Sequence, residues 1–143
     1  MRFASLPLFA AILTFAPLAA TASSAVGDWL TADRGAVIRV ARCGADLCGT
    51  IVWLKDRTDP ATGRPVVDVA NPDPALRDHP ILGLRILSAF KPAGEDRWTG
   101  GRIYNPDSGR SYRANLSLRA NGDLAVQGCL AVFCHTQKWT PTR

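Results

Sequence analysis

Hydrophobic and polar positions alternate along most of the chain after residue 23. The clearest case is the segment 112–119, where Tyr112, Ala114, Leu116 and Leu118 alternate with polar residues. A period of two is typical of a β-strand with one buried and one solvated face, and helical spacing is nearly absent here. Similar runs recur between turn residues at 26–31, 36–43, 47–54, 84–91, 98–104, 124–130 and 133–140. The pattern predicts an all-β domain with about eight antiparallel strands.

The connections between these runs are mostly short. Asn105-Pro106-Asp107-Ser108-Gly109 and Asn121-Gly122 are hairpin turn sequences. Strands joined consecutively by hairpins can close into an up-and-down barrel without free edges, and eight strands leave room for one small ligand. A sandwich needs several longer crossing connections, whereas this chain has one. We therefore predict an eight-stranded up-and-down barrel, with Gly100-Gly101 marking a bulge where a strand bends.

The one long connection lies between the third and fourth predicted strands, at residues 56–80. Its proline and glycine residues indicate turns, and Asn71 followed by Pro72 predicts a short helix that ends before Pro80. Long connections in compact domains are often functional. This one is either a lid or binding loop, or a plug packed over one end of the barrel.

Four cysteines occur in two pairs with four residues between the members of each pair. Within a hairpin, this spacing places the two cysteines opposite each other on adjacent strands, at a distance that suits a disulfide. We predict the bonds Cys43–Cys48 and Cys129–Cys134. A zinc site formed by all four thiolates is one alternative, but its usual spacing is shorter and an oxidising compartment disfavours free thiolates. Free thiols or crossed pairs are the other alternative.

The first 22 residues have the pattern of a secretory signal peptide. Arg2 supplies the positive start, residues 6–18 are apolar, and Ala20-Thr21-Ala22 fits a cleavage site. The apolar run is too short and too interrupted by proline to span about 30 Å of hydrocarbon. We therefore expect a signal peptide at 1–22, cleaved near Ala22, and a single domain at 23–143 in the periplasm or outside the cell. No later stretch approaches the length of a transmembrane span.

Charge argues against a nucleic-acid partner. The chain has 17 Lys and Arg against 12 Asp and Glu, a net charge of +5, but the basic residues are scattered rather than gathered on one strip. Catalytic motifs are also missing, as are metal-binding and phosphate-binding motifs, so no cofactor or metal is expected. A hydrolase built on Asp73, Asp107 and His79 is conceivable, although turn and capping roles explain both aspartates.

A binding pocket is the better functional hypothesis. Trp53, Trp98 and Tyr104 are large aromatic residues on separate predicted strands, and Arg77 lies in the long connection. Arg102 shares a strand face with Trp98 and Tyr104 if no bulge shifts the register, and an inward arginine needs an anionic partner. These five residues are the candidate ligand site, for a small apolar or amphipathic molecule with an acidic head. The alternative is plain core packing of the aromatic residues.

Several short motifs together resemble a known family. Gly27-Asp28-Trp29 resembles the G-x-W motif of lipocalins and other calycins, in which the tryptophan plugs the closed end of the barrel. Further motifs follow in order along the chain: Cys48-Gly49-Thr50-Ile51-Val52-Trp53, Asn71-Pro72-Asp73, Gly101-Arg102-Ile103-Tyr104-Asn105-Pro106, Gly128-Cys129-Leu130 and Trp139-Thr140. Together they resemble the bacterial exported family known as domain of unknown function 2147.

The resemblance implies a calycin-like barrel, a signal peptide, Trp29 as the barrel-end plug and no established activity. Three hypotheses follow: a barrel that binds a small ligand, an envelope interaction module whose core is filled by its own side chains, and a hydrolase. A hollow interior separates the first from the second.

Overall fold

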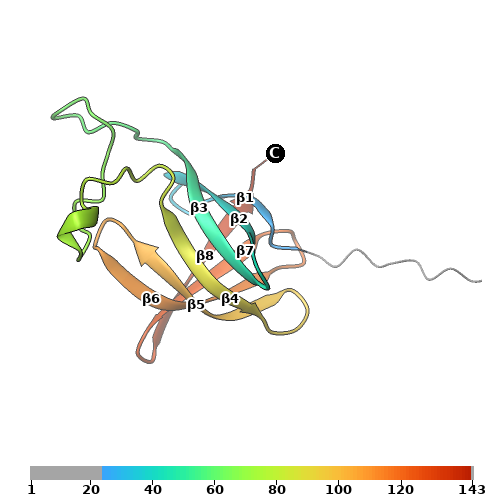
Figure 1. The fold of residues 1–143 in the computed structure, drawn as a ribbon. Coiled ribbons are helices and arrows are strands. Elements are labelled where there is room, and N and C mark those ends of the chain that lie inside the picture. Colours follow the sequence, from blue (N-terminus) through green and yellow to red (C-terminus); the bar gives the residue numbers. More distant parts are fainter. Residues whose placement is uncertain (1–23, 143) are drawn as a thin grey trace, which may run out of the picture.

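The computed structural model describes residues 24–142, which form a closed barrel of eight antiparallel strands (Figure 1). The strands follow one another around the barrel in sequence order, as predicted. Their bounds are β1 Gly27–Leu30, β2 Ala36–Cys43, β3 Asp46–Leu54, β4 Arg85–Pro92, β5 Arg97–Asn105, β6 Arg110–Leu118, β7 Leu124–Leu130 and β8 Phe133–Pro141. The sequence-based prediction of an eight-stranded up-and-down barrel is confirmed.

The barrel closes where β1 pairs with β8. The first strand is shorter than predicted, with four residues, and its register with β8 covers Trp29↔Pro141 and Leu30↔Thr140. By contrast, β2 and β3 pair along their whole lengths, from Ala36↔Leu54 to Cys43↔Asp46. The seam between first and last strand is therefore the shortest pairing around the barrel.

The core is the barrel interior. Inward side chains come from every strand because residues alternate between the two faces of a sheet. The buried cluster includes Trp29, Ile38, Val40, Leu47, Ile51, Leu87, Phe90, Ala114, Leu116, Leu124, Val126 and Trp139.

Register shifts modify the alternation at four points, one between β2 and β3, two between β3 and β4, and one between β5 and β6. Ala89 has a positive φ of 59°, and both Leu87 and Phe90 are buried, so the alternation expected along β4 is broken at this residue. The register of β5 with β6 shifts between Trp98 and Gly101, as the glycine pair predicted. Gly101 lies against the ring of Phe90, where a Cβ atom would overlap the aromatic carbons.

Both predicted disulfides are present. Cys43–Cys48 links β2 to β3 with a Cα separation of 5.8 Å, and Cys129–Cys134 links β7 to β8 with 4.0 Å. They lie at opposite ends of the barrel because β2–β3 and β7–β8 turn at opposite ends. Disulfides are compatible with an extracytoplasmic protein.

The long connection between β3 and β4 contains less helix than predicted. A single 3₁₀ turn, Pro74–Leu76, is capped by Asp73, whose carboxylate accepts a hydrogen bond of 3.0 Å from the Ala75 N–H. Asn71 does not cap it. Its side-chain oxygen accepts from the Asp73 N–H at 2.9 Å and its amide nitrogen donates to Asp68. The helical turn therefore begins two residues later than predicted, with Asp73 as its cap.

No helix in the described range 24–142 is long and apolar enough to cross a membrane. The predicted signal peptide at 1–22 lies outside the described residues.

Candidate ligand cavity

The barrel encloses a cavity of about 780 Å³ that opens at one end. Its walls are apolar side chains that project inward from six strands: Ile38, Ile51, Ile86, Ile103, Val126 and Trp139. Ligand pockets in proteins have volumes of about 300–1,000 Å³ and mostly apolar walls. The size and the lining of the cavity therefore suit a small organic molecule.

The mouth is formed by three turns that Figure 1 shows on the left of the barrel. Thr31 and Asp33 come from the β1–β2 turn, and Asn105 and Asp107 come from the β5–β6 turn. The β7–β8 hairpin contributes apolar residues, Leu130 and Phe133, and the polar His135. The mouth thus combines hydrogen-bonding groups with an apolar lip.

Charge at the mouth is negative. Asp33 accepts hydrogen bonds from the Thr31 hydroxyl at 2.7 Å and from the Gly35 N–H at 2.9 Å. These bonds, that of Thr31 first, lower the pKa of the Asp33 carboxyl, which therefore stays ionised at neutral pH. Asp107 is a second carboxylate at the mouth, and no lysine or arginine from the described part of the chain lines the cavity.

Trp139 is the largest buried side chain lining the cavity. It is 2% exposed, and its indole N–H donates to the side-chain oxygen of Gln137 at 3.1 Å. Gln137 also lines the cavity, two residues earlier on the same inward face of β8. Sequence reasoning missed both residues as site candidates. The period of two along β8, which puts His135, Gln137 and Trp139 on one face, is the signal that would have found them.

Tyr104 is the predicted site residue that does line the cavity. Its hydroxyl donates to the carboxylate of Asp68, at 2.8 Å from Oδ1 and 3.0 Å from Oδ2. Asp68 is 1% exposed and also accepts from the Asn71 side-chain amide at 2.7 Å. Burial, followed by the hydrogen bond and the charge of Asp68, raises the pKa of Tyr104 to about 12. This buried cluster, which we call the Asp68 latch, fastens the long connection to β5.

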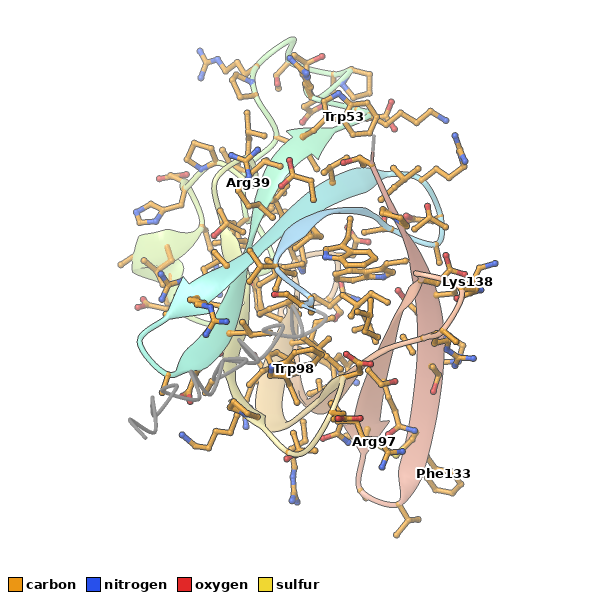
Figure 2. All side chains as sticks on the ribbon, turned by 90° about the vertical axis from the view of Figure 1, so that its right-hand side faces the viewer. Arg39, Trp53, Arg97, Trp98, Phe133 and Lys138 are labelled. Carbon is orange, nitrogen blue, oxygen red and sulfur yellow. A yellow bond between two sulfur atoms is a disulfide. The ribbon has the colours of Figure 1, made fainter. Side chains whose placement is uncertain are left out.

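The structure does not bring the other four predicted ligand residues to the cavity. Trp53 lies on the outer side of the barrel, beside Val37 and Arg39, and Trp98 packs against the core without lining the cavity. Figure 2 shows these two tryptophans well apart, Trp53 at the top of the view and Trp98 in the lower centre.

Both predicted arginines are exposed. The guanidinium of Arg77 donates from Nε to the carbonyl of Asn71 at 2.8 Å, within the long connection. Arg102 lies opposite Ser88 and Arg113 on the outer face. The prediction of an inward Arg102 required an unbroken register. The bulge between Trp98 and Gly101 shifts that register by one position, so Arg102 faces solvent.

Trp29 is buried, and its indole N–H donates to the carbonyl of Ala25 at 2.8 Å. It belongs to the core cluster and does not line the cavity. Its role as a barrel-end plug stays a prediction.

The residues proposed for a hydrolase have other structural roles. Asp73 caps the 3₁₀ turn, and His79 is exposed and accepts a backbone hydrogen bond from the Asp68 N–H at 2.9 Å. Asp107 lies at the cavity mouth. Among residues 24–142, no group of three or more His, Cys, Asp and Glu side chains is placed to hold a metal ion.

Comparison with known proteins supports the fold and the family. A solved structure from Helicobacter pylori, protein HP1028, is described as belonging to the lipocalin family. It superposes with a TM-score of 0.72 at 20% sequence identity, over 84% of each chain. No curated protein matches the sequence. The sequence profile of a bacterial family described as "uncharacterized protein conserved in bacteria (DUF2147)" matches residues 27–141, and the chain belongs to this family.

Proposed function

We propose that the protein binds a small apolar or amphipathic molecule inside the barrel. The observation that carries this proposal is the cavity of about 780 Å³ that extends from the mouth into the barrel, with its apolar walls. A barrel with a purely structural role has no need of such a space, because filling it with side chains gains about 25 cal/mol for each Å² of apolar surface removed from water. The hollow interior thus favours ligand binding over the alternative of an interaction module with a filled core.

The chemistry of the mouth narrows the class of ligand. Asp33 and Asp107 are carboxylates, Gln137 and His135 offer hydrogen bonds, and no described lysine or arginine lines the cavity. An acidic head, as the sequence suggested, has no cation to pair with there and meets two like charges. We therefore propose an apolar body with a neutral, hydrogen-bonding head.

The proposed location is the periplasm or the exterior of the cell, after cleavage near Ala22. The two disulfides support an oxidising compartment. The mass of the protein recovered from the periplasm tests the cleavage site directly.

A displacement assay tests the binding proposal. The neutral probe N-phenyl-1-naphthylamine gains fluorescence in apolar surroundings, and linear alcohols of increasing length should displace it from the wild-type barrel. Gly128→Leu places a side chain into the cavity beside Ile103 and should abolish probe binding. Thr136→Leu adds the same side chain to the same hairpin at a residue that does not line the cavity, and should bind like wild type. Equal binding by both variants, or no probe binding by the wild-type protein, contradicts the proposal.

A further inference from the structure

The tip of the β7–β8 hairpin exposes large apolar side chains next to the cavity mouth. Leu130, Val132 and Phe133 are 62%, 87% and 80% exposed. Single exposed apolar residues are common on protein surfaces, but three within four consecutive residues form a patch that marks an interaction site. Figure 2 shows Phe133 near the lower end of the molecule, at the tip of the hairpin.

This tip is a rigid projection. The Cys129–Cys134 disulfide ties its two strands together directly behind the apolar residues. β1 reaches β8 at Thr140 and Pro141, so the stretch of β8 from Phe133 to Lys138 extends past the seam and is exposed. A preformed hairpin loses little conformational freedom when it binds, which favours association. We call residues 130–133 the apolar finger.

Charge on the strands behind the finger is positive, although other turns of the mouth carry Asp33 and Asp107. The strands β6, β7 and β8 contain no aspartate or glutamate, whereas Arg110 and Arg113 are exposed on β6. Arg113 is the register partner of Cys129, which places this arginine at the base of the finger. An apolar tip with cations behind it is complementary to an anionic lipid surface, where acyl chains lie below a layer of phosphates.

We propose that the apolar finger docks the protein on an anionic phospholipid membrane. Leu130, Val132 and Phe133 enter the boundary between headgroups and acyl chains, while Arg110 and Arg113 lie at the level of the phosphates. Leu130 and Phe133 also line the cavity, so the finger docks beside its mouth. The inference stands on the exposed finger and its charge and holds whether or not the cavity takes a ligand.

Sedimentation with vesicles tests this proposal on the full mature chain. We expect binding to vesicles of equal parts phosphatidylglycerol and phosphatidylcholine, and weak binding to phosphatidylcholine alone. The double variant Val132→Ser/Phe133→Ser should bind the anionic vesicles at least about tenfold more weakly, because two large apolar side chains no longer leave water. Arg113→Gln should weaken binding about fivefold, on anionic vesicles alone.

The matched control is Val69→Ser/Leu82→Ser. It removes two apolar side chains that are 70% and 47% exposed in the long connection, away from the finger, and should bind like wild type. All replaced side chains are exposed, and thermal unfolding checks that each variant folds. An equal loss of vesicle binding in both double variants overturns the proposal. Wild-type protein that stays in the supernatant with anionic vesicles also overturns it. A dimer in sedimentation equilibrium that the finger variant dissociates also overturns it, because the finger then binds a second copy.

Discussion

Removal of one hydroxyl group from the Asp68 latch should destabilise the protein by a predictable amount. Tyr104→Phe deletes the donor that lies 2.8 Å and 3.0 Å from the two oxygens of the Asp68 carboxylate. Asp68 is buried, and the Asn71 amide is then the side-chain donor that it keeps. A hydrogen bond to a charged group is worth about 1.5–3 kcal/mol, so the free energy of unfolding should fall by about that amount.

Urea unfolding followed by tryptophan fluorescence measures this change. The midpoint should fall with an unchanged slope, which indicates lost stability rather than a changed denatured state. Tyr112→Phe is the control, because the Tyr112 hydroxyl makes no hydrogen bond to the described residues. A Tyr104→Phe protein within about 0.5 kcal/mol of wild type, or an equal loss in Tyr112→Phe, would refute the role of the latch.

The same residue gives a prediction at alkaline pH. The pKa of Tyr104 is raised from 10.0 to about 12, so folding favours the protonated phenol. Its contribution to stability is complete below pH 10.0 and is lost as the pH rises towards 12. Wild-type stability should therefore decline over this window, and the decline should be shallower in Tyr104→Phe. Equal slopes in the two proteins would show that the phenol does not titrate as described.

Three further predictions concern the barrel itself. Gly101→Ala should lower stability by about 1–3 kcal/mol in urea unfolding, because the new methyl group overlaps the ring of Phe90. The pKa of Asp28 is lowered, first by its hydrogen bond to Arg39. The contribution of Asp28 to folding stability is therefore present above pH 3.8 and is lost as the pH falls further. Asp28→Asn should make the loss of stability at acid pH shallower in urea unfolding. Reduction of both disulfides should lower the melting temperature while far-ultraviolet circular dichroism keeps its β-sheet form, because both bridges close short hairpin loops.

The strands and their order could be predicted because local rules determine them. Alternation along segments such as 112–119 fixes the strand face, and short turns such as 105–109 leave neighbouring strands antiparallel. The disulfides followed from the same rules, since paired positions in a hairpin fix which sulfur atoms meet. Each inference used residues close together in the chain.

The candidate site was predicted far less well, because closure of the barrel determines it. Tyr104 lines the cavity, whereas the bulges at Ala89 and Gly101 alter which side chains face inward and leave Arg102 outside. One extra residue in a strand reverses the inward or outward direction of every side chain that follows it. The alternating pattern of the sequence does not show where that extra residue lies. Asp68 went unnoticed for a related reason: a single aspartate in a loop carries no pattern, and its partner lies 36 residues away.

The two ends of the barrel differ because β1 is short. Its register with β8 stops at Leu30↔Thr140 on the side of the mouth, so β8 from Phe133 to Lys138 has no partner on that edge. Unpaired edges are usually a liability, but this one carries Lys138 and two polar residues that line the open cavity, His135 and Gln137. The short first strand thus leaves the wall of the barrel open beside the mouth. The open seam and the unpaired edge of β8 therefore have one structural cause, a first strand that ends before the barrel does.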